Sequence, residues 1–349
     1  MEFLFEYGLF LAKAITFLVT VTALFVIVIA LTSKQKNKKG EIELTDISEQ
    51  LKETKKSIEE QLLTPFQLKI RQKEDKKSQK EKDKLAKKLA KKGDQPESLA
   101  QLYVVDFKGS IDAKEVTSLR EEITAILGVA SEKDEVFVRL ESGGGMVHGY
   151  GLAASQLQRL KDNNIPLTIA VDKVAASGGY MMACIADKII AAPFAILGSI
   201  GVIAQIPNFN KLLKKHDIEF EQLTAGDYKR TLTMFGENDD KGRAKFKQEL
   251  QETHDLFKHF VSEHRPSIDI EKVATGEHWY GLQAIKLNLI DKITTSDDYL
   301  LSQLDNRHIV QIKYSLRKKL ADKLGHGASL ALENSLLKLM QLNVSRLFK

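Results

Sequence analysis

The sequence lacks the residue patterns that build disulfides, metal centres and nucleotide sites. It contains one cysteine, Cys184, so the chain cannot form an internal disulfide. Its eight histidines are scattered, no cluster of histidine, cysteine and aspartate has metal-ligand spacing, and no phosphate-binding loop of the GxxxxGK type is present. We therefore expect no metal ion and no other cofactor. Cys184 lies in a helical pattern and is interpreted as a small buried apolar residue.

Aromatic residues are missing from the most strongly charged stretch, "KEDKKSQKEKDKLAKKLAKKGD". Residues 41–93 as a whole are rich in lysine and glutamate, have few large apolar side chains, and supply much of the net charge of +5. Interleaved charges of both signs are typical of a solvated helix or of disorder. Proteins that bind single-stranded nucleic acid interleave basic residues with aromatic stacking platforms. We therefore expect no nucleic-acid partner, and contact with anionic lipid headgroups is the favoured alternative.

One long apolar run lies near the N-terminus, from Leu9 to Leu31, broken only by threonines and Lys13. A helix of this length spans a bilayer core of about 30 Å. A cleaved signal peptide is the alternative, but the run exceeds a usual apolar region and no A-x-A-like cleavage site precedes the polar segment. Four lysines follow within residues 34–39. Because positive residues tend to stay on the cytoplasmic side, we expect a retained anchor and a cytoplasmic body.

From residue 101 onward, strand patterns alternate with helix patterns. Such alternation predicts β-α-β units, a parallel sheet and helices that cover it. The expected strands are 102–111, 134–142, 165–172, 188–193 and 200–206. The expected helices are 113–129, 148–161, 208–215, 239–264 and one from about 281, before a last short strand. Beyond residue 315, leucines at helical spacing predict an amphipathic tail that caps the core or contacts another subunit.

Two glycine-rich turns follow predicted strands, one at Gly143–Gly145 and one around Ser177 in "VAASGGYMMACIAD". The carboxyl ends of parallel strands open into a common crevice. Amides of one turn can then face the residue that the other turn presents, which is the arrangement of an oxyanion hole. Ser177 has two interpretations: a helix N-cap in a tight turn of small residues, or a nucleophile that a substrate backbone can approach.

A nucleophilic serine requires a base, and the histidines offer only His148, in a glycine-rich turn. A lysine can serve instead when burial lowers its pKa enough to keep the amine neutral. Lys229, in "AGDYKRTLTMF", is a candidate because its surroundings are of modest polarity.

Five stretches in order resemble the signal peptide peptidase (SppA-like) family of membrane-anchored serine proteases. They are "ESGGGMVHGYG", "KVAASGGYMMACIADKIIAAP", "ILGSIGVI", "AGDYKRTLTMF" and "ATGEHWYGLQAIKLNLID", and the similarity covers about residues 102–291. The resemblance implies an α/β, ClpP/crotonase-like core of β-α-β units. It also implies a Ser/Lys dyad that hydrolyses peptide bonds through an acyl-enzyme, with Ser177 as nucleophile and Lys229 as general base.

Three further site residues follow from the resemblance. Gly144 and Gly178 supply the oxyanion-hole amides, and Ser199 hydrogen-bonds the dyad lysine. The family often has Ser-Pro-Gly-Gly at the first turn, where this chain has Ser142 followed by three glycines. The missing proline leaves φ free at Gly143, so the turn is less constrained before substrate binds.

The expected organisation is an anchor at residues 1–33, a helical or disordered linker at 34–97, a protease domain at 98–300 and an amphipathic helical tail at 301–349. The expected location is the bacterial inner membrane. Expected partners are peptide or protein substrates, such as signal-peptide remnants and unfolded or membrane polypeptides, and the lipid bilayer. The resemblance also implies a homo-oligomeric ring in which subunits share dyads. The alternatives are a catalytically inactive membrane scaffold on the same fold and a crotonase-like acyl-CoA enzyme.

Overall fold

A computed structural model describes residues 2–32, 40–64, 66–71 and 99–315, with five further positions between 73 and 84. The chain divides into two units, one of residues 1–41 with 315–349 and one of residues 42–314.

The described part of the first unit is dominated by helix α1 (Glu2–Thr32), which is 31 residues long. One window of it, Phe5–Thr22, is long and apolar enough to cross a membrane. The hydroxyl groups of Thr16, Thr20 and Thr22 donate to carbonyl oxygens four residues earlier, at 2.6–2.8 Å. Since each hydroxyl is satisfied within the helix, these threonines do not prevent α1 from lying in an apolar medium.

The second unit is built on a seven-stranded sheet with the order β1-β10-β2-β3-β4-β6-β9. The neighbouring pairs from β10 through to β9 are parallel. The strands are β1 (Glu41–Asp46), β2 (Gln101–Lys108), β3 (Glu135–Glu141), β4 (Leu167–Val171), β6 (Lys188–Ala191), β9 (Lys292–Ile293) and β10 (His308–Ser315). The middle strands are buried on both faces, as their continuous apolar runs predict.

Helices cover both faces of this sheet. Helix α4 (Val116–Leu127) buries Leu119, Ile123 and Ile126 along one stripe, which is the pattern of an amphipathic helix. It packs beside α5 (Val147–Asp162), and α5 packs against the short buried α6 (Gly178–Ala183). A second core cluster includes Phe137 and a residue of α11 (Ser296–Gln303), Tyr299, whose rings stack at 4.8 Å.

A second, three-stranded sheet has the order β5-β7-β8. Strands β5 (Val174–Ala176) and β7 (Ile196–Gly198) are parallel, and β8 (His278–Tyr280) is antiparallel to β7. A parallel bridge between Ser142 and Ala175 connects the end of β3 to β5. Three short helical elements also belong to this unit: α9 (Ile270–Val273), α10 (Gly281–Ala284) and the 3-10 turn η1 (Ile285–Leu287).

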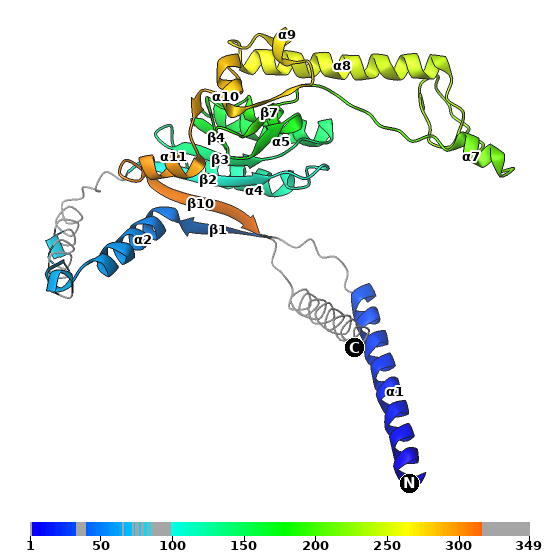
Figure 1. Cartoon of the computed structure of the whole chain (residues 1–349), viewed down its shortest axis with the longest axis horizontal. Helices are drawn as coiled ribbons and strands as arrows, with labels where there is room; N and C mark the ends of the chain where they lie inside the picture. Colours follow the sequence, from blue (N-terminus) through cyan, green and yellow to red (C-terminus); the bar gives the residue numbers. More distant parts are fainter. Residues whose placement is uncertain are drawn as a thin grey trace, which may run out of the picture. The chain divides into compact units, whose positions relative to one another are not determined.

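Between β7 and α8 the chain leaves the two sheets, reaches α7 (Asn210–Lys215) and returns (Figure 1). We call residues 201–239 the arm. All of residues 201–240 are described, and none is buried. The arm ends where Asp239 caps α8 (Asp240–His264) by accepting from Gly242 N at 2.6 Å. The arm thus has no core of its own.

The α/β fold class is confirmed, and most expected helices and strands are present. The strand expected at 200–206 is wrong: β7 ends at Gly198, and residues 201–209 form no regular structure. The physical reason is the turn itself, because Gly198 and Ser199 both have positive φ, 94° and 50°.

Several strands, among them β1, β7, β8 and β10, occur where the sequence predicted none. Strand β1, followed by helix α2 (Ile47–Leu62), lies inside the expected linker of residues 34–97. The expected tail of residues 301–349 begins with the end of α11 and then β10, so residues 301–315 complete the domain. The rest of that tail, from residue 316, lies outside the described residues, as do residues 33–39 and most of 72–98.

Candidate active site

The two glycine-rich turns meet, as their position after parallel strands predicts. Gly144 has a φ of 86°, a conformation that favours glycine. A Cβ atom built on Gly144 would lie 2.7 Å from Gly178 N and 2.7 Å from the Cβ of Ser177. The backbone of the first turn therefore lies directly against the serine of the second. Three of the expected site residues are brought together by this contact.

Ser177 has a strained backbone, with a φ of 52° and a ψ of −120°. A non-glycine residue in such a conformation costs on the order of 1–3 kcal/mol, and such residues cluster at functional sites. Ser177 N donates to Gly198 O at 2.8 Å, which holds the residue in this position. Although Ser177 precedes α6, its side chain makes no capping hydrogen bond in the structure. The interpretation of Ser177 as a mere helix cap thus lacks the contact that would define it.

Strand pairing places Ser199 beside Ser177. In the parallel pair of β5 and β7, Ala176 is opposite Gly198, so the next residues along each strand are Ser177 and Ser199. Ser199 N donates to Glu277 O at 2.6 Å, and the side chain of Ser199 is half-buried. Ser199 therefore directly follows the strand that pairs with the Ser177 strand, and its role toward the dyad lysine remains a prediction.

The two glycines after Ser177 are needed for packing. A Cβ on Gly178 would collide with the ring of Tyr150, and a Cβ on Gly179 would lie 2.5 Å from Ser142 O. These contacts explain why the sequence has "SGG" at this point. They also place Tyr150 and Ser142 beneath the site, and sequence reasoning assigned neither residue a role.

Lys229 is not joined to Ser177 within the chain. It lies on the arm, exposed, and its backbone N–H donates to Gly226 O at 3.1 Å. Its amine has no hydrogen-bond or ion-pair partner among the described residues. Lys229 borders a hollow of about 850 Å³ whose walls are arm residues, among them Ile206, Phe220, Leu223 and Phe235. His148, the alternative base, is exposed at the start of α5.

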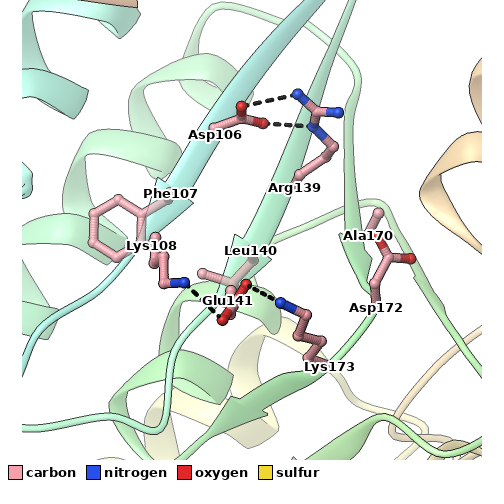
Figure 2. Close-up of a pocket in the computed structure, with 9 residues that line it drawn as sticks. All are labelled: Asp106, Phe107, Lys108, Arg139, Leu140, Glu141, Ala170, Asp172 and Lys173. Atoms are coloured by element: carbon pink, nitrogen blue, oxygen red, sulfur yellow. Dashed lines mark hydrogen bonds and ion pairs between the residues drawn. The ribbon is translucent and has the colours of Figure 1, made fainter. Parts of the chain in front are cut away.

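A network of ion pairs fixes the strand ends from which the turns leave (Figure 2). Glu141, at the end of β3, pairs with Lys108 and Lys173, each at 3.2 Å. The two ammonium groups lower the pKa of the Glu141 carboxyl, because both donate hydrogen bonds to it. Nearby, Arg139 holds Asp106 with two hydrogen bonds of 2.5 and 2.8 Å. Glu141 immediately precedes the first turn, so these pairs tie β2, β3 and the start of β5 together.

The described residues offer neither a cluster of metal ligands nor a reactive thiol. They contain no group of three or more His, Cys, Asp or Glu residues that could hold a metal ion. Cys184 is buried, as expected, and its thiol donates to Met181 O at 3.3 Å. Burial raises the pKa of this thiol well above its ordinary value, so it stays protonated and unreactive.

Two family models match almost the whole chain up to residue 309. The N-terminal model of peptidase family S49 matches residues 2–157, and the peptidase family S49 model itself matches residues 159–309. The chain belongs to peptidase family S49. The expected relationship to signal peptide peptidase-like proteases is thereby confirmed, and an S49 protease acts on polypeptides. Family membership supports proteolysis over the acyl-CoA alternative.

Two curated relatives are similar to the chain over nearly their whole length. The chain is 54% identical to the "Probable protease SohB" of Haemophilus influenzae over 329 residues, which are 94% of this chain and 93% of the relative. It is 50% identical to the "Probable protease SohB" of Buchnera aphidicola subsp. Acyrthosiphon pisum, over 97% of this chain and 98% of the relative. A solved structure of a membrane-bound stomatin-specific protease with a substrate peptide gives a TM-score of 0.40 at 15% identity, covering 65% of this chain and 96% of that one.

Proposed function

We propose that this S49 protease is a membrane-anchored serine endopeptidase that works through Ser177 and Lys229. The observation that carries the proposal is the strained Ser177, held against the backbone of Gly144 and followed by Gly178. In the proposed reaction, neutral Lys229 takes the proton of Ser177 Oγ as this oxygen attacks the substrate carbonyl carbon. The amides of Gly144 and Gly178 stabilise the oxyanion, and Ser199 orients the lysine.

The second half of the reaction returns the enzyme to its starting state. Collapse of the tetrahedral intermediate breaks the C–N bond, and the leaving amine takes the proton from Lys229. Water then attacks the ester on Ser177, with Lys229 accepting its proton and returning it to the Ser177 oxygen when the carboxylic acid leaves. All groups in this cycle belong to the protein, the peptide or water.

We propose further that the dyad forms between copies of the chain in a closed ring. Lys229 is in solvent within one chain, whereas a lysine base needs burial to lower its pKa. The arm that carries it exposes large apolar side chains, including Leu223 at 87% and Ile203 at 79%. A neighbouring copy would bury these side chains and desolvate the lysine in one step. This arrangement would supply the base that a single chain does not.

The proposed substrates are signal-peptide remnants and unfolded or membrane polypeptides, cleaved at the inner membrane. Helix α1 supports the anchor through its length and composition. The lysines at 34–39 favour a cytoplasmic catalytic domain. An alkaline phosphatase fused to the C-terminus should then be inactive, and an active fusion would place the domain on the opposite side.

Labelling with a serine-reactive acylating probe tests the nucleophile. The detergent-solubilised full-length protein should be labelled, and Ser177→Ala should abolish the label. Ser155→Ala is the matched control, because Ser155 is exposed on α5 and donates only to Gly151 O. Absence of labelling in the wild-type protein would instead favour the inactive-scaffold alternative.

Mixing two inactive variants tests the shared dyad. Ser177→Ala and Lys229→Ala should each lack peptidase activity, and their mixture should recover part of it once subunits exchange. Some contacts then pair an intact serine with an intact lysine. Lys211→Ala is the control, because Lys211 is also exposed on the arm, and it should stay active. No recovery despite demonstrated subunit exchange would mean that each chain builds its own dyad.

A further inference from the structure

A chain of hydrogen bonds runs from the first turn into the core. Gly144 N donates to Ser142 Oγ at 3.1 Å, Ser142 Oγ lies 2.5 Å from the hydroxyl of Tyr150, and that hydroxyl donates to Ser110 O at 2.9 Å. Phenol and alcohol groups each have one proton to donate. Because the Tyr150 proton goes to a carbonyl, Ser142 must donate to Tyr150. The Ser142 oxygen is then an acceptor toward Gly144.

The two side chains of this relay cannot easily move. Ser142 is 2% exposed and Tyr150 is fully buried. Gly109 leaves just enough room for them, because a Cβ there would lie 2.8 Å from Ser142 Oγ and would contact the Tyr150 hydroxyl more closely still. Ser142 is also held by its backbone, which donates to Val174 O at 2.8 Å and accepts from Ala176 N at 3.0 Å. The acceptor that Gly144 meets is therefore fixed in place.

The same tyrosine touches both turns. Its ring packs directly under Gly178, and its hydroxyl reaches Gly144 through Ser142. Gly144 and Gly178 are the two residues whose amides the proposed function assigns to the oxyanion. One buried side chain thus contacts the backbone of the second turn and controls the hydrogen-bond acceptor of the first.

We propose that Ser142 and Tyr150 are positioning residues. They keep the Gly144 amide hydrogen-bonded to the Ser142 hydroxyl until a substrate oxyanion takes the place of that hydroxyl as the acceptor. This inference rests on the proposed function. An N–H has a single proton, so the amide cannot serve Ser142 and an oxyanion at full strength together. In the resting enzyme the bond satisfies a half-buried amide. An oxyanion is the stronger acceptor because it is charged, and Gly143 leaves the peptide before Gly144 free to rotate.

Ser142→Ala removes the resting acceptor and hence the competitor of the oxyanion. A peptide aldehyde probes the oxyanion state, because the serine oxygen adds to its carbonyl and leaves an oxygen in the oxyanion position. We expect Ser142→Ala to bind the aldehyde several-fold more tightly, since a neutral hydrogen bond no longer has to break. The affinity of the matching non-covalent peptide alcohol should not change. General damage to the site would instead weaken both ligands.

Tyr150→Phe keeps the ring under Gly178 and removes only the hydroxyl. Ser142 then loses the partner that polarises it, so we expect a smaller gain in aldehyde affinity than in Ser142→Ala. Ser155→Ala is the control for removal of a serine hydroxyl and should leave both affinities unchanged. For each variant, the fraction of chains that react with the acylating probe is measured first, so that affinities refer to folded sites.

The outcomes separate this inference from the proposed function. A wild-type protein that forms no aldehyde adduct at Ser177 would refute the proposed function and, with it, the inference. An adduct in the wild type with unchanged or weaker aldehyde affinity in Ser142→Ala would refute the inference alone. Tighter aldehyde binding with unchanged alcohol binding would establish Ser142 as the resting acceptor of the Gly144 amide.

Discussion

Glu122 should make the domain more stable when it is neutral than when it is charged. It lies on α4 and is only 5% exposed. Burial is the main reason why its pKa is raised from 4.5 to about 6, and Asp106 adds to the effect, whereas the Tyr314 N–H bond at 2.8 Å and Lys313 oppose it. The folded state therefore binds this proton more tightly than the unfolded state. The contribution is fully present below pH 4.5 and is lost as the pH rises through about 6.

The magnitude follows from the size of the shift. Each unit of pKa corresponds to about 1.4 kcal/mol, so the rise from 4.5 to about 6 corresponds to at most about 2 kcal/mol. Glu122→Gln keeps an oxygen for Tyr314 N and cannot ionise. We expect this variant to have an unfolding free energy up to about 2 kcal/mol higher than that of the wild type at pH 8, with little gain at pH 4.

Urea unfolding of the full-length protein in detergent measures this difference. The single tryptophan, Trp279, lies on β8 within the domain and reports the transition. Glu121→Gln is the matched control, because the Glu121 side chain, next to Glu122 in the sequence, is 45% exposed and pairs with Arg120 at 3.8 Å. A gain that is equal at pH 4 and pH 8, or no gain at pH 8, would show that ionisation of Glu122 does not destabilise the fold.

Three further predictions concern the site, the arm and the first strand. Gly178→Ala should abolish probe labelling, because its Cβ would collide with the tyrosine ring beneath it, whereas Gly151→Ala, which has open space, should label normally; equal labelling of both would contradict the packing. Leu223→Asp should shift the protein to smaller species in sedimentation and reduce activity, if its exposed side chain contacts another copy; an unchanged size would remove the arm from the interface. Asp46 accepts a hydrogen bond from Glu49 N and contacts His308 at 2.7 Å. The bond from Glu49 is the main cause that lowers the pKa of the Asp46 carboxyl. The contribution of Asp46 to folding stability is therefore present above its ordinary pKa of 3.8 and is lost as the pH falls below that value. Asp46→Asn should thus speed proteolysis near β1 at pH 7, and less so below pH 3; equal rates at pH 7 would argue against this contact.

The site was predictable where local pattern determines geometry. Strand-to-turn transitions at residues 141–145 and 174–178 place both glycine turns at carboxyl ends of parallel strands, and the structure brings them into contact. The roles assigned to Ser177, Lys229, Gly144, Gly178 and Ser199 remain predictions. The position of Lys229 could not be inferred, because it depends on a segment with no buried residue.

Other errors have physical causes in single residues. Ile203 and Ile206 predicted a buried strand, but both are exposed, and apolar character does not distinguish a core from an uncovered surface. Strand β1 was missed because "EIELTD" is largely exposed and charged, without an apolar run. It pairs in the sheet with β10, which lies far away in sequence. The sequence did not indicate a role for Ser142 or Tyr150, because these residues come into contact only once the turns have folded.

The coreless arm has a consequence for when the enzyme is active. If Lys229 reaches Ser177 only on another copy of the chain, active sites form only when copies associate. The rate of proteolysis by newly made, dilute protein would then depend on the square, or a higher power, of the protein concentration. An anchor in a bilayer confines all copies to a thin layer and so raises their local concentration. Synthesis away from the membrane would then give an inert polypeptide, and no inhibitory propeptide would be needed to keep it inactive. Abundance in the membrane, rather than a cleavage event, would set the threshold at which proteolysis begins.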